Sequence, residues 1–120
     1  MKRLTPKEEE IMNIFWKEGS KFVRELLAYY DDPKPHYNTV STLVRGLEEK
    51  EFLAYNAYGN TYQYYPLISE KTYKSSTLKD LVAHYYNNSY TNVVSTFIEE
   101  DGISLDELKE LIKEIENKRK

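Results

Sequence analysis

The side chains of this chain best suited to recognition chemistry form a short polar series in its middle. Asn and Arg can each make two hydrogen bonds to a base edge of a nucleic acid, and the methyl group of Thr can contact thymine. Such side chains read a base sequence when one helix presents them together to the major groove. The series therefore predicts a base-reading surface, and its members are Asn38, Thr39, Ser41, Thr42 and Arg45.

A plainer interpretation of the same series stays open at this point. Asn38 lies near the expected start of a helix and can cap it with its side chain. The remaining polar residues can then form an ordinary solvated face. Both interpretations require a helix, and they differ in whether its polar face has a partner.

The helix that carries the series is expected from hydrophobic periodicity. Val40, Leu43, Val44 and Leu47 repeat at helical spacing, which places them on the side opposite the polar series. Gly46 stands in the helix interior, where it costs about 1 kcal/mol relative to Ala. We therefore expect another backbone to approach this helix closely at Gly46.

A β-hairpin is expected directly after this helix. Residues 53–58 and 61–65 are rich in strand formers, and Gly59-Asn60 between them suits a two-residue turn with positive φ. Pro66 cannot donate to a strand ladder, so it predicts the end of the second strand. A helix followed by a tight hairpin is the order of a winged helix-turn-helix, whose wing lies on the DNA backbone. The turn therefore adds two candidate DNA-binding residues, Asn60 and Thr61.

Two helices are expected before the polar series. Thr5 and Glu8 form a capping box around Pro6, which suits the first helical position, and Gly19 ends that helix. Ser20 is predicted to cap a second, shorter helix. Apolar residues at helical spacing predict the core of this part, namely Ile11, Met12, Phe15, Trp16, Val23, Leu26, Leu27 and Tyr30.

Three further helices are expected after residue 68, with breaks at Asn87-Asn88 and Asp101-Gly102. Ser89 and Ser104 are predicted to cap the second and third of them, and Tyr73 falls on the apolar stripe of the first. These helices carry too many apolar residues for solvent but are too short for a core of their own. We therefore expect a second copy of the chain to cover them. The candidate dimerisation residues are Leu78, Leu81, Val82, Tyr85, Val94, Phe97, Leu108, Leu111, Ile112 and Ile115.

Length and charge bound the architecture. The 120 residues are enough for one domain, or for a small domain with an oligomerisation segment. We predict a mostly α fold with a small antiparallel β-hairpin, in which residues 1–67 form a winged helix-turn-helix and residues 68–120 a dimerisation segment. The net charge is −3. Affinity for DNA must therefore depend on local placement, dimerisation and base contacts, because overall charge gives no phosphate attraction.

Several other functions are excluded by the residues that the chain lacks. There is no cysteine, and His36 and His84 have no partner at metal-ligand spacing, so we expect neither a metal site nor a cofactor. No glycine-rich phosphate loop or nucleophile elbow is present, so we expect no enzyme. Because the chain has no long apolar run and no secretory signal, we expect a cytoplasmic location.

The twelve tyrosines allow one more interpretation. Tyr62, Tyr64 and Tyr65 cluster on one expected strand and could form a stacking platform for single-stranded nucleic acid. Alternatively, they pack one face against the core and leave their hydroxyl groups at the rim.

Four segments of the chain resemble a known family in their order and spacing. On these segments the chain resembles the penicillinase repressors, the BlaI/MecI/CopY family of bacterial transcriptional regulators. The segments are LTPKEEEIMNIFW, NTVSTLVRGLEEKEFL, YQYYPLISEKTY and FIEEDGISLDELKELIKEI.

The resemblance implies a dimeric, sequence-specific repressor that binds double-stranded operator DNA with dyad symmetry. It implies that the reading-helix residues are Asn38, Thr39, Ser41 and Thr42, followed by Arg45. In antibiotic-responsive members a membrane sensor protease signals, and the repressor is cut between Asn and Phe. The aligned pair here is Thr96-Phe97, which makes it the candidate cleavage position. The alternative function is a winged-helix protein-interaction module that does not bind DNA.

Overall fold

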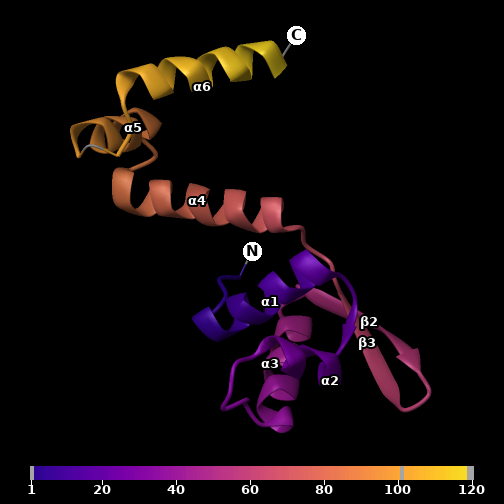
Figure 1. Ribbon diagram of the computed structural model, residues 1–120. Coiled ribbons are helices and arrows are strands. Elements are labelled where there is room, and N and C mark those ends of the chain that lie inside the picture. Colours follow the sequence, from indigo (N-terminus) through magenta and orange to yellow (C-terminus); the bar gives the residue numbers. More distant parts are fainter. Residues whose placement is uncertain (1, 101, 119–120) are drawn as a thin grey trace. The chain divides into compact units, whose positions relative to one another are not determined.

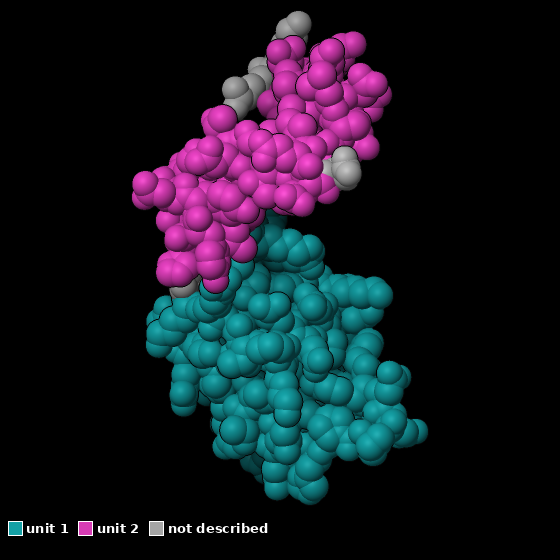
Figure 2. Space-filling model, turned by 90° about the vertical axis from the view of Figure 1, so that its left-hand side faces the viewer, with its two compact units in different colours: residues 1–77 teal, residues 78–120 magenta. Residues whose placement is uncertain are grey.

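The computed structural model describes residues 2–100 and 102–118 (Figure 1). It divides into two compact units, residues 1–77 and residues 78–120, which Figure 2 colours teal and magenta. The predicted fold class is confirmed, since the described residues are mostly helical with a small antiparallel sheet. The elements are α1 (Pro6–Glu18), β1 (Lys21–Phe22), α2 (Val23–Leu26), the 3-10 turn η1 (Leu27–Tyr29), α3 (Tyr37–Glu49), β2 (Leu53–Tyr58), β3 (Thr61–Pro66), α4 (Glu70–Tyr86), α5 (Tyr90–Glu99) and α6 (Leu105–Lys118).

Helix α1 begins as its sequence predicts. The Thr5 hydroxyl accepts a hydrogen bond from the Glu8 N–H at 3.2 Å, and the Glu8 carboxylate accepts one from the Thr5 N–H at 2.9 Å. Pro6 occupies the first helical position, and Gly19, with φ of 84°, follows the last turn. The predicted capping box and terminator are both confirmed.

The second helix begins later than predicted, and Ser20 does not cap it. Lys21 and Phe22 form the short strand β1, and α2 starts at Val23. The Phe22 N–H donates to the Glu25 carboxylate at 2.9 Å, so Glu25 supplies the bond that was expected from Ser20. The prediction is wrong because β1 pairs with β3, and a strand ladder holds this backbone extended.

The hairpin is confirmed, and it forms a three-stranded antiparallel sheet in the order β1-β3-β2. Its register pairs Leu53 with Pro66 at one end and Tyr58 with Thr61 at the turn. Gly59 has φ of 61°, as a two-residue turn of this kind requires. Pro66 is the last residue of β3, as predicted.

The core of the first unit lies between α1, α2, α3 and the inner part of the sheet. The predicted core residues Trp16, Leu27, Tyr30 and Leu43 lie at its edge and are half-buried. Phe52, which links α3 to β2 and was not predicted, is fully buried. The central residues include Ile11, Met12, Phe15, Val23, Leu26, Val40, Val44, Leu47 and Leu53.

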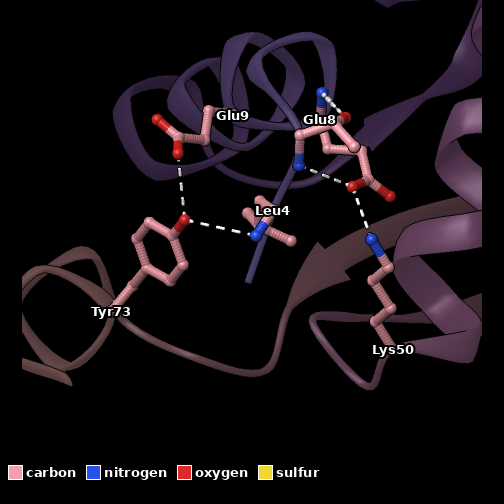
Figure 3. Close-up of polar contacts among 6 residues, drawn as sticks. Leu4, Glu8, Glu9, Lys50 and Tyr73 are labelled. Carbon is pink, nitrogen blue, oxygen red and sulfur yellow. Dashed lines mark hydrogen bonds and ion pairs between the residues drawn. The ribbon is translucent and has the colours of Figure 1, made fainter. Parts of the chain in front are cut away.

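Tyr73, in the first turn of α4, also belongs to this core. It is 6% exposed, and its ring lies 5.5 Å from Trp16 and 5.6 Å from Phe52 between centroids. Its hydroxyl accepts from the Leu4 N–H at 3.4 Å and donates to the Glu9 carboxylate at 3.0 Å (Figure 3). The start of α4 therefore completes the first unit, which extends past residue 67.

Gly46 has a different neighbour from the one expected. A Cβ at this position would lie 3.6 Å from the Glu8 carboxylate, which is an ordinary contact with a side chain. The predicted close approach of another backbone is therefore wrong. A Cβ at this position would therefore fit without a clash.

Glu8 joins the start of α1 to the end of α3. Its carboxylate accepts a hydrogen bond from the Lys50 ammonium group at 2.6 Å (Figure 3), and the two side chains are 7% and 26% exposed. Burial by itself raises the pKa of Glu8, but the bonds from Lys50 and Thr5 outweigh burial and lower the pKa below its ordinary value. Glu8 therefore stabilises the fold above its ordinary pKa, and this contribution is lost as pH falls through its lowered value.

Replacing Lys50 with Met is expected to lower the free energy of unfolding by about 2 kcal/mol at pH 7. Breaking a fully buried pair costs roughly 3–5 kcal/mol, but Lys50 is partly solvated and so contributes less. The loss should shrink as pH falls, because the unpaired Glu8 then takes up a proton. Urea unfolding at pH 7 and pH 4 measures the difference.

The double variant Glu8→Gln/Lys50→Met is the control for this pair. Gln keeps the capping bond of α1 but carries no charge. We expect it to recover much of the stability that Lys50→Met loses. An equal loss at both pH values would contradict a charge interaction between these residues.

The second unit contains the rest of α4, then α5 and α6. Asn87 and Asn88 have φ of 51° and 64° and end α4, as their sequence predicts. The Ser89 hydroxyl accepts from the Asn92 N–H at 3.2 Å, and the Ser104 hydroxyl accepts from the Glu107 N–H at 3.1 Å. Both predicted caps are confirmed. The predicted break at Asp101-Gly102 includes one residue, Asp101, that lies outside the described residues.

Candidate nucleic-acid interface

Helix α3 carries the predicted base-reading series, and its start is fixed by His36. The His36 Nδ1 atom accepts a hydrogen bond from the Asn38 N–H at 3.0 Å, and the helix begins at Tyr37. Asn38 therefore does not cap the helix, so that part of the alternative is wrong, while the interpretation of the other polar residues as a solvated face stays open. The Asn38 side chain is exposed on the first turn, where the residues of a reading helix contact bases.

The polar series divides over the exposed side of α3. Val40, Val44 and Leu47 are fully buried, so the opposite side faces outward. Asn38 and Thr42 lie on this outward side one turn apart, and the Thr42 hydroxyl donates to the Asn38 carbonyl oxygen at 2.9 Å. These two residues occupy the middle of the exposed face.

Thr39 lies at one edge of that face. It borders a small cavity of about 220 Å³, together with Pro33 and Pro35 of the preceding loop and Lys7 of α1. Thr39 is exposed, and the cavity that it borders is also lined by residues of α1 and of the proline loop. A base contact from Thr39 would therefore come from the rim of the reading surface.

Ser41 and Arg45 lie at the other edge, toward the hairpin. Together with Tyr37 they form one wall of a cleft of about 460 Å³. The hairpin contributes the opposite wall, which includes Asn60, Thr61 and Tyr62. The structure therefore brings the predicted helix residues and the predicted turn residues to one surface, although their role in DNA binding stays a prediction.

Two further parts of this surface were missed by the sequence analysis. Arg24 of α2 lines the same cleft, and so does Phe22 of β1. No local signal marks either residue, because the strand pairing of Phe22 with Gln63 is what carries α2 beside the hairpin.

The hairpin tyrosines do not form the single-strand platform considered above. Tyr64 is 5% exposed and belongs to the core, while Tyr65 alternates to the other face of the strand. Tyr55 and Tyr62 stack on each other with ring centroids 4.1 Å apart, and Tyr55 also contacts Tyr64 at 5.5 Å. The tyrosines therefore form a ladder that runs from the core along the hairpin.

Charge on this surface is sparse and local. Within the residues that the structure describes, no carboxylate lies within 4 Å of Arg24 or Arg45. Arg45 makes one long contact, from its Nη2 atom to the Thr42 hydroxyl at 3.4 Å. Glu49 follows one turn later at the end of α3, so an approaching phosphate backbone is favoured near the start of the helix.

The described residues include neither a candidate metal-binding cluster nor a helix that could span a membrane. No group of three or more His, Asp or Glu side chains there is placed to hold a metal ion. None of the described helices has the length and apolar character needed to cross a membrane.

Comparison with known proteins identifies the family. The profile of the family described as penicillinase repressor matches residues 4–117. The chain belongs to the penicillinase repressor family. The resemblance noted in its sequence is thereby confirmed over nearly its whole length.

Alignments with individual members of the penicillinase repressor family cover most of this chain. The methicillin resistance regulatory protein MecI of Mammaliicoccus sciuri is 30% identical over 109 residues, covering 87% of this chain and 85% of MecI. MecI of Staphylococcus aureus strain N315 gives the same values. The penicillinase repressor of Bacillus licheniformis is 26% identical over 126 residues, covering 98% of this chain and 95% of that protein. These relatives are named as regulators, not as enzymes.

In this family member the candidate dimerisation residues lie in or near the second unit, and most are exposed. Phe97 is 57% exposed and Ile112 is 48% exposed. Val82 differs, because at 1% exposure it is already buried in a single chain and adds no area to a dimer. Leu81 and Leu108 are half-buried, and the other exposed members are Leu78, Tyr85, Val94, Leu111 and Ile115.

The candidate cleavage position, Thr96-Phe97, lies inside helix α5. The Thr96 hydroxyl donates to the Asn92 carbonyl oxygen at 2.9 Å, and the helix continues to Glu99. A protease could reach this peptide bond only after local opening of α5.

Proposed function

We propose that this chain represses transcription as a homodimer bound to double-stranded operator DNA with dyad symmetry. The observation that carries the proposal is the surface on which the exposed side of α3 meets the β2–β3 turn. Asn38 and Thr42 are exposed on this side of α3, and Ser41 and Arg45 line one cleft with Asn60 and Thr61. This is the arrangement by which a winged helix-turn-helix reads one half-site.

Exposed apolar residues in the second unit support the homodimer. Phe97, Leu111 and Ile112 each leave more than two fifths of their surface in solvent, at 57%, 46% and 48%. Apolar side chains of this size gain about 1.5–3 kcal/mol each when they are fully buried. A second copy of the same segment covers them by a two-fold contact, which also pairs two reading helices.

Proteolytic release is the second part of the proposal. A cut between Thr96 and Phe97 would separate α6 and the end of α5 from the DNA-binding unit. The exposed residues Phe97, Leu111 and Ile112 would leave with the fragment, so the dimer would come apart. A membrane sensor protease is the proposed partner for this step. If the chain stayed intact in cells in which repression had been relieved, proteolytic release would be excluded.

Replacing Asn38 with Ala is expected to lower affinity for the operator by about 1–3 kcal/mol and to reduce the preference for it over random DNA. The purified chain is titrated with duplex from upstream of its own gene and with a scrambled duplex of equal length. Asn13→Ala, on the exposed side of α1, is the matched control and should change neither value.

The DNA preference of the wild-type chain must be measured before any variant is interpreted, because it tests the proposed function directly. If it showed no preference for its upstream DNA at any salt concentration, the repressor proposal would be wrong. The acidic balance and the exposed hairpin tyrosines, such as Tyr58 at 55%, would then favour the alternative of a protein-interaction module.

A further inference from the structure

The cleft between α3 and the hairpin has a wall that base reading does not explain. Arg24 comes from α2, is exposed, and lines this cleft together with residues of α3 and the hairpin. Arg45 lines the same cleft from α3. Two arginines from different elements thus line one cavity of about 460 Å³.

We propose that one sugar–phosphate strand of DNA occupies this cleft and that Arg24 and Arg45 bind its phosphates. The proposal rests on the DNA binding proposed above and adds the position of the backbone. It also changes the role of Arg45, which the sequence analysis expected to read a base. Under this proposal Asn38 and Thr42 read bases, while Arg45 fixes the register of the protein on the duplex.

The charge of the cleft supports an anionic occupant. Within the described parts of the chain, no carboxylate pairs with Arg24 or Arg45, so both guanidinium groups are available. Glu25 is the one acidic residue among those lining the cleft, and its carboxylate accepts the Phe22 N–H at 2.9 Å. The cleft is therefore locally positive in a chain whose net charge is −3.

Continuity with the reading surface favours a DNA strand over a small anion. The cleft opens between α3 and the hairpin, and Ser41 extends it with a hydroxyl donor on the α3 side, whereas the Thr61 hydroxyl already donates to the Tyr58 carbonyl oxygen at 2.9 Å. Guanidinium groups match phosphate oxygens with two parallel hydrogen bonds, and hydroxyl groups also bind the DNA backbone. A winged helix-turn-helix places duplex backbone beside its wing in the same way.

The uncharged hairpin turn makes these two arginines more important. Gly59, Asn60 and Thr61 offer no cation to the backbone. Arg24 lines the same cleft as Asn60 and Thr61 and supplies the positive charge that the turn lacks. Arg24 thus takes the place of a basic residue in the wing as a ligand for the DNA backbone.

The test measures how the affinity of the full-length chain for DNA changes between about 50 and 200 mM salt. Each phosphate contact contributes about 0.9 to the slope of log affinity against log salt concentration. Arg24→Ala and Arg45→Ala should each lower that slope by about 0.9 per bound chain. Affinity should fall by the same factor on upstream and scrambled duplexes, so the specificity ratio should not change.

Three further variants sharpen the test. Arg3→Ala removes an exposed arginine outside the cleft and should leave the slope unchanged, which separates a direct contact from a change in overall charge. Arg24→Lys keeps a phosphate-binding charge and should retain the slope. Glu25→Gln keeps the acceptor for the Phe22 N–H but removes the negative charge, so it should strengthen binding to both duplexes.

The outcomes separate this inference from the proposed function. A wild-type chain without any preference for upstream DNA would reject the repressor itself. If that preference is present and Arg24→Ala leaves the salt slope unchanged, only the backbone position is wrong. A fall in the specificity ratio of Arg45→Ala would return Arg45 to base reading and overturn its role as a phosphate ligand.

Discussion

Replacing Ile112 with Asp is expected to lower affinity for an operator with two half-sites by about 100- to 10 000-fold, since linking two reading units raises avidity by that factor. Ile112 is 48% exposed on α6, between Leu111 at 46% and Ile115 at 43%. In a two-fold interface the substitution would bury a carboxylate from each copy, which is costly without a partner charge. Affinity for a single half-site should not change, because the reading surface is untouched.

Titrations with a dyad duplex and with a half-site duplex measure this effect, and light scattering follows the oligomeric state. Asn117→Asp is the matched control, since it adds the same carboxylate to an exposed position on α6 away from Ile112. If the wild-type chain were monomeric at micromolar concentration and bound both duplexes equally, the dimer proposal would be wrong.

Replacing Tyr73 with Ala is expected to lower the free energy of unfolding of the first unit by about 4 kcal/mol, as for other large buried aromatic residues. The ring is 6% exposed and contacts Trp16 and Phe52. Removing it leaves a cavity between α1 and the start of β2. Urea unfolding followed by fluorescence reports the first unit, because Trp16 is the only tryptophan and lies beside Tyr73.

Two control variants show how much of the lost stability comes from the Tyr73 ring and how much from its hydroxyl group. Tyr73→Phe keeps the ring and removes only the hydroxyl bonds to Leu4 and Glu9, so it should cost about 1 kcal/mol. Ser75→Ala, at an exposed position on the same helix, should cost less than about 0.5 kcal/mol. Equal losses for Tyr73→Ala and Ser75→Ala would show that the Tyr73 ring does not contribute to the first unit.

The parts of the fold that local signals specify could be predicted from the sequence. Thr5 and Glu8 are three residues apart, and the bonds they exchange depend on nothing else in the chain. The Gly59-Asn60 turn likewise defines the hairpin within a few residues. Helical periodicity located α3 because Val40, Val44 and Leu47 repeat along one element.

The parts that depend on distant segments could not be predicted. Strand β1 has two residues and exists only because Lys21 pairs with Tyr64. Tyr73 and Leu78 were both expected on the apolar side of one helix, and contact with Trp16 and Phe52 is what marks Tyr73 as a core residue. Residue spacing predicts neither the pairing of β1 with β3 nor the contacts of Tyr73 with Trp16 and Phe52.

The candidate site shows the same division. Residue type and spacing located the series from Asn38 to Arg45, since one helix carries all of it. They could not show that Thr39 borders the proline loop, or that Arg45 lines the cleft. Arg24 could not be found at all, because its place beside the hairpin depends on the pairing of β1 with β3.

The uncharged hairpin turn has a consequence for how a repressor of this kind would find its operator. Binding to random DNA is almost wholly electrostatic, and a genome offers roughly a million or more competing sites. With Gly59, Asn60 and Thr61 in place of cations, and a net charge of −3, we expect this chain to bind those sites more weakly than a repressor with a basic hairpin turn would. Fewer copies would therefore be held on random DNA between encounters, and a smaller number of molecules per cell would suffice to keep the operator occupied.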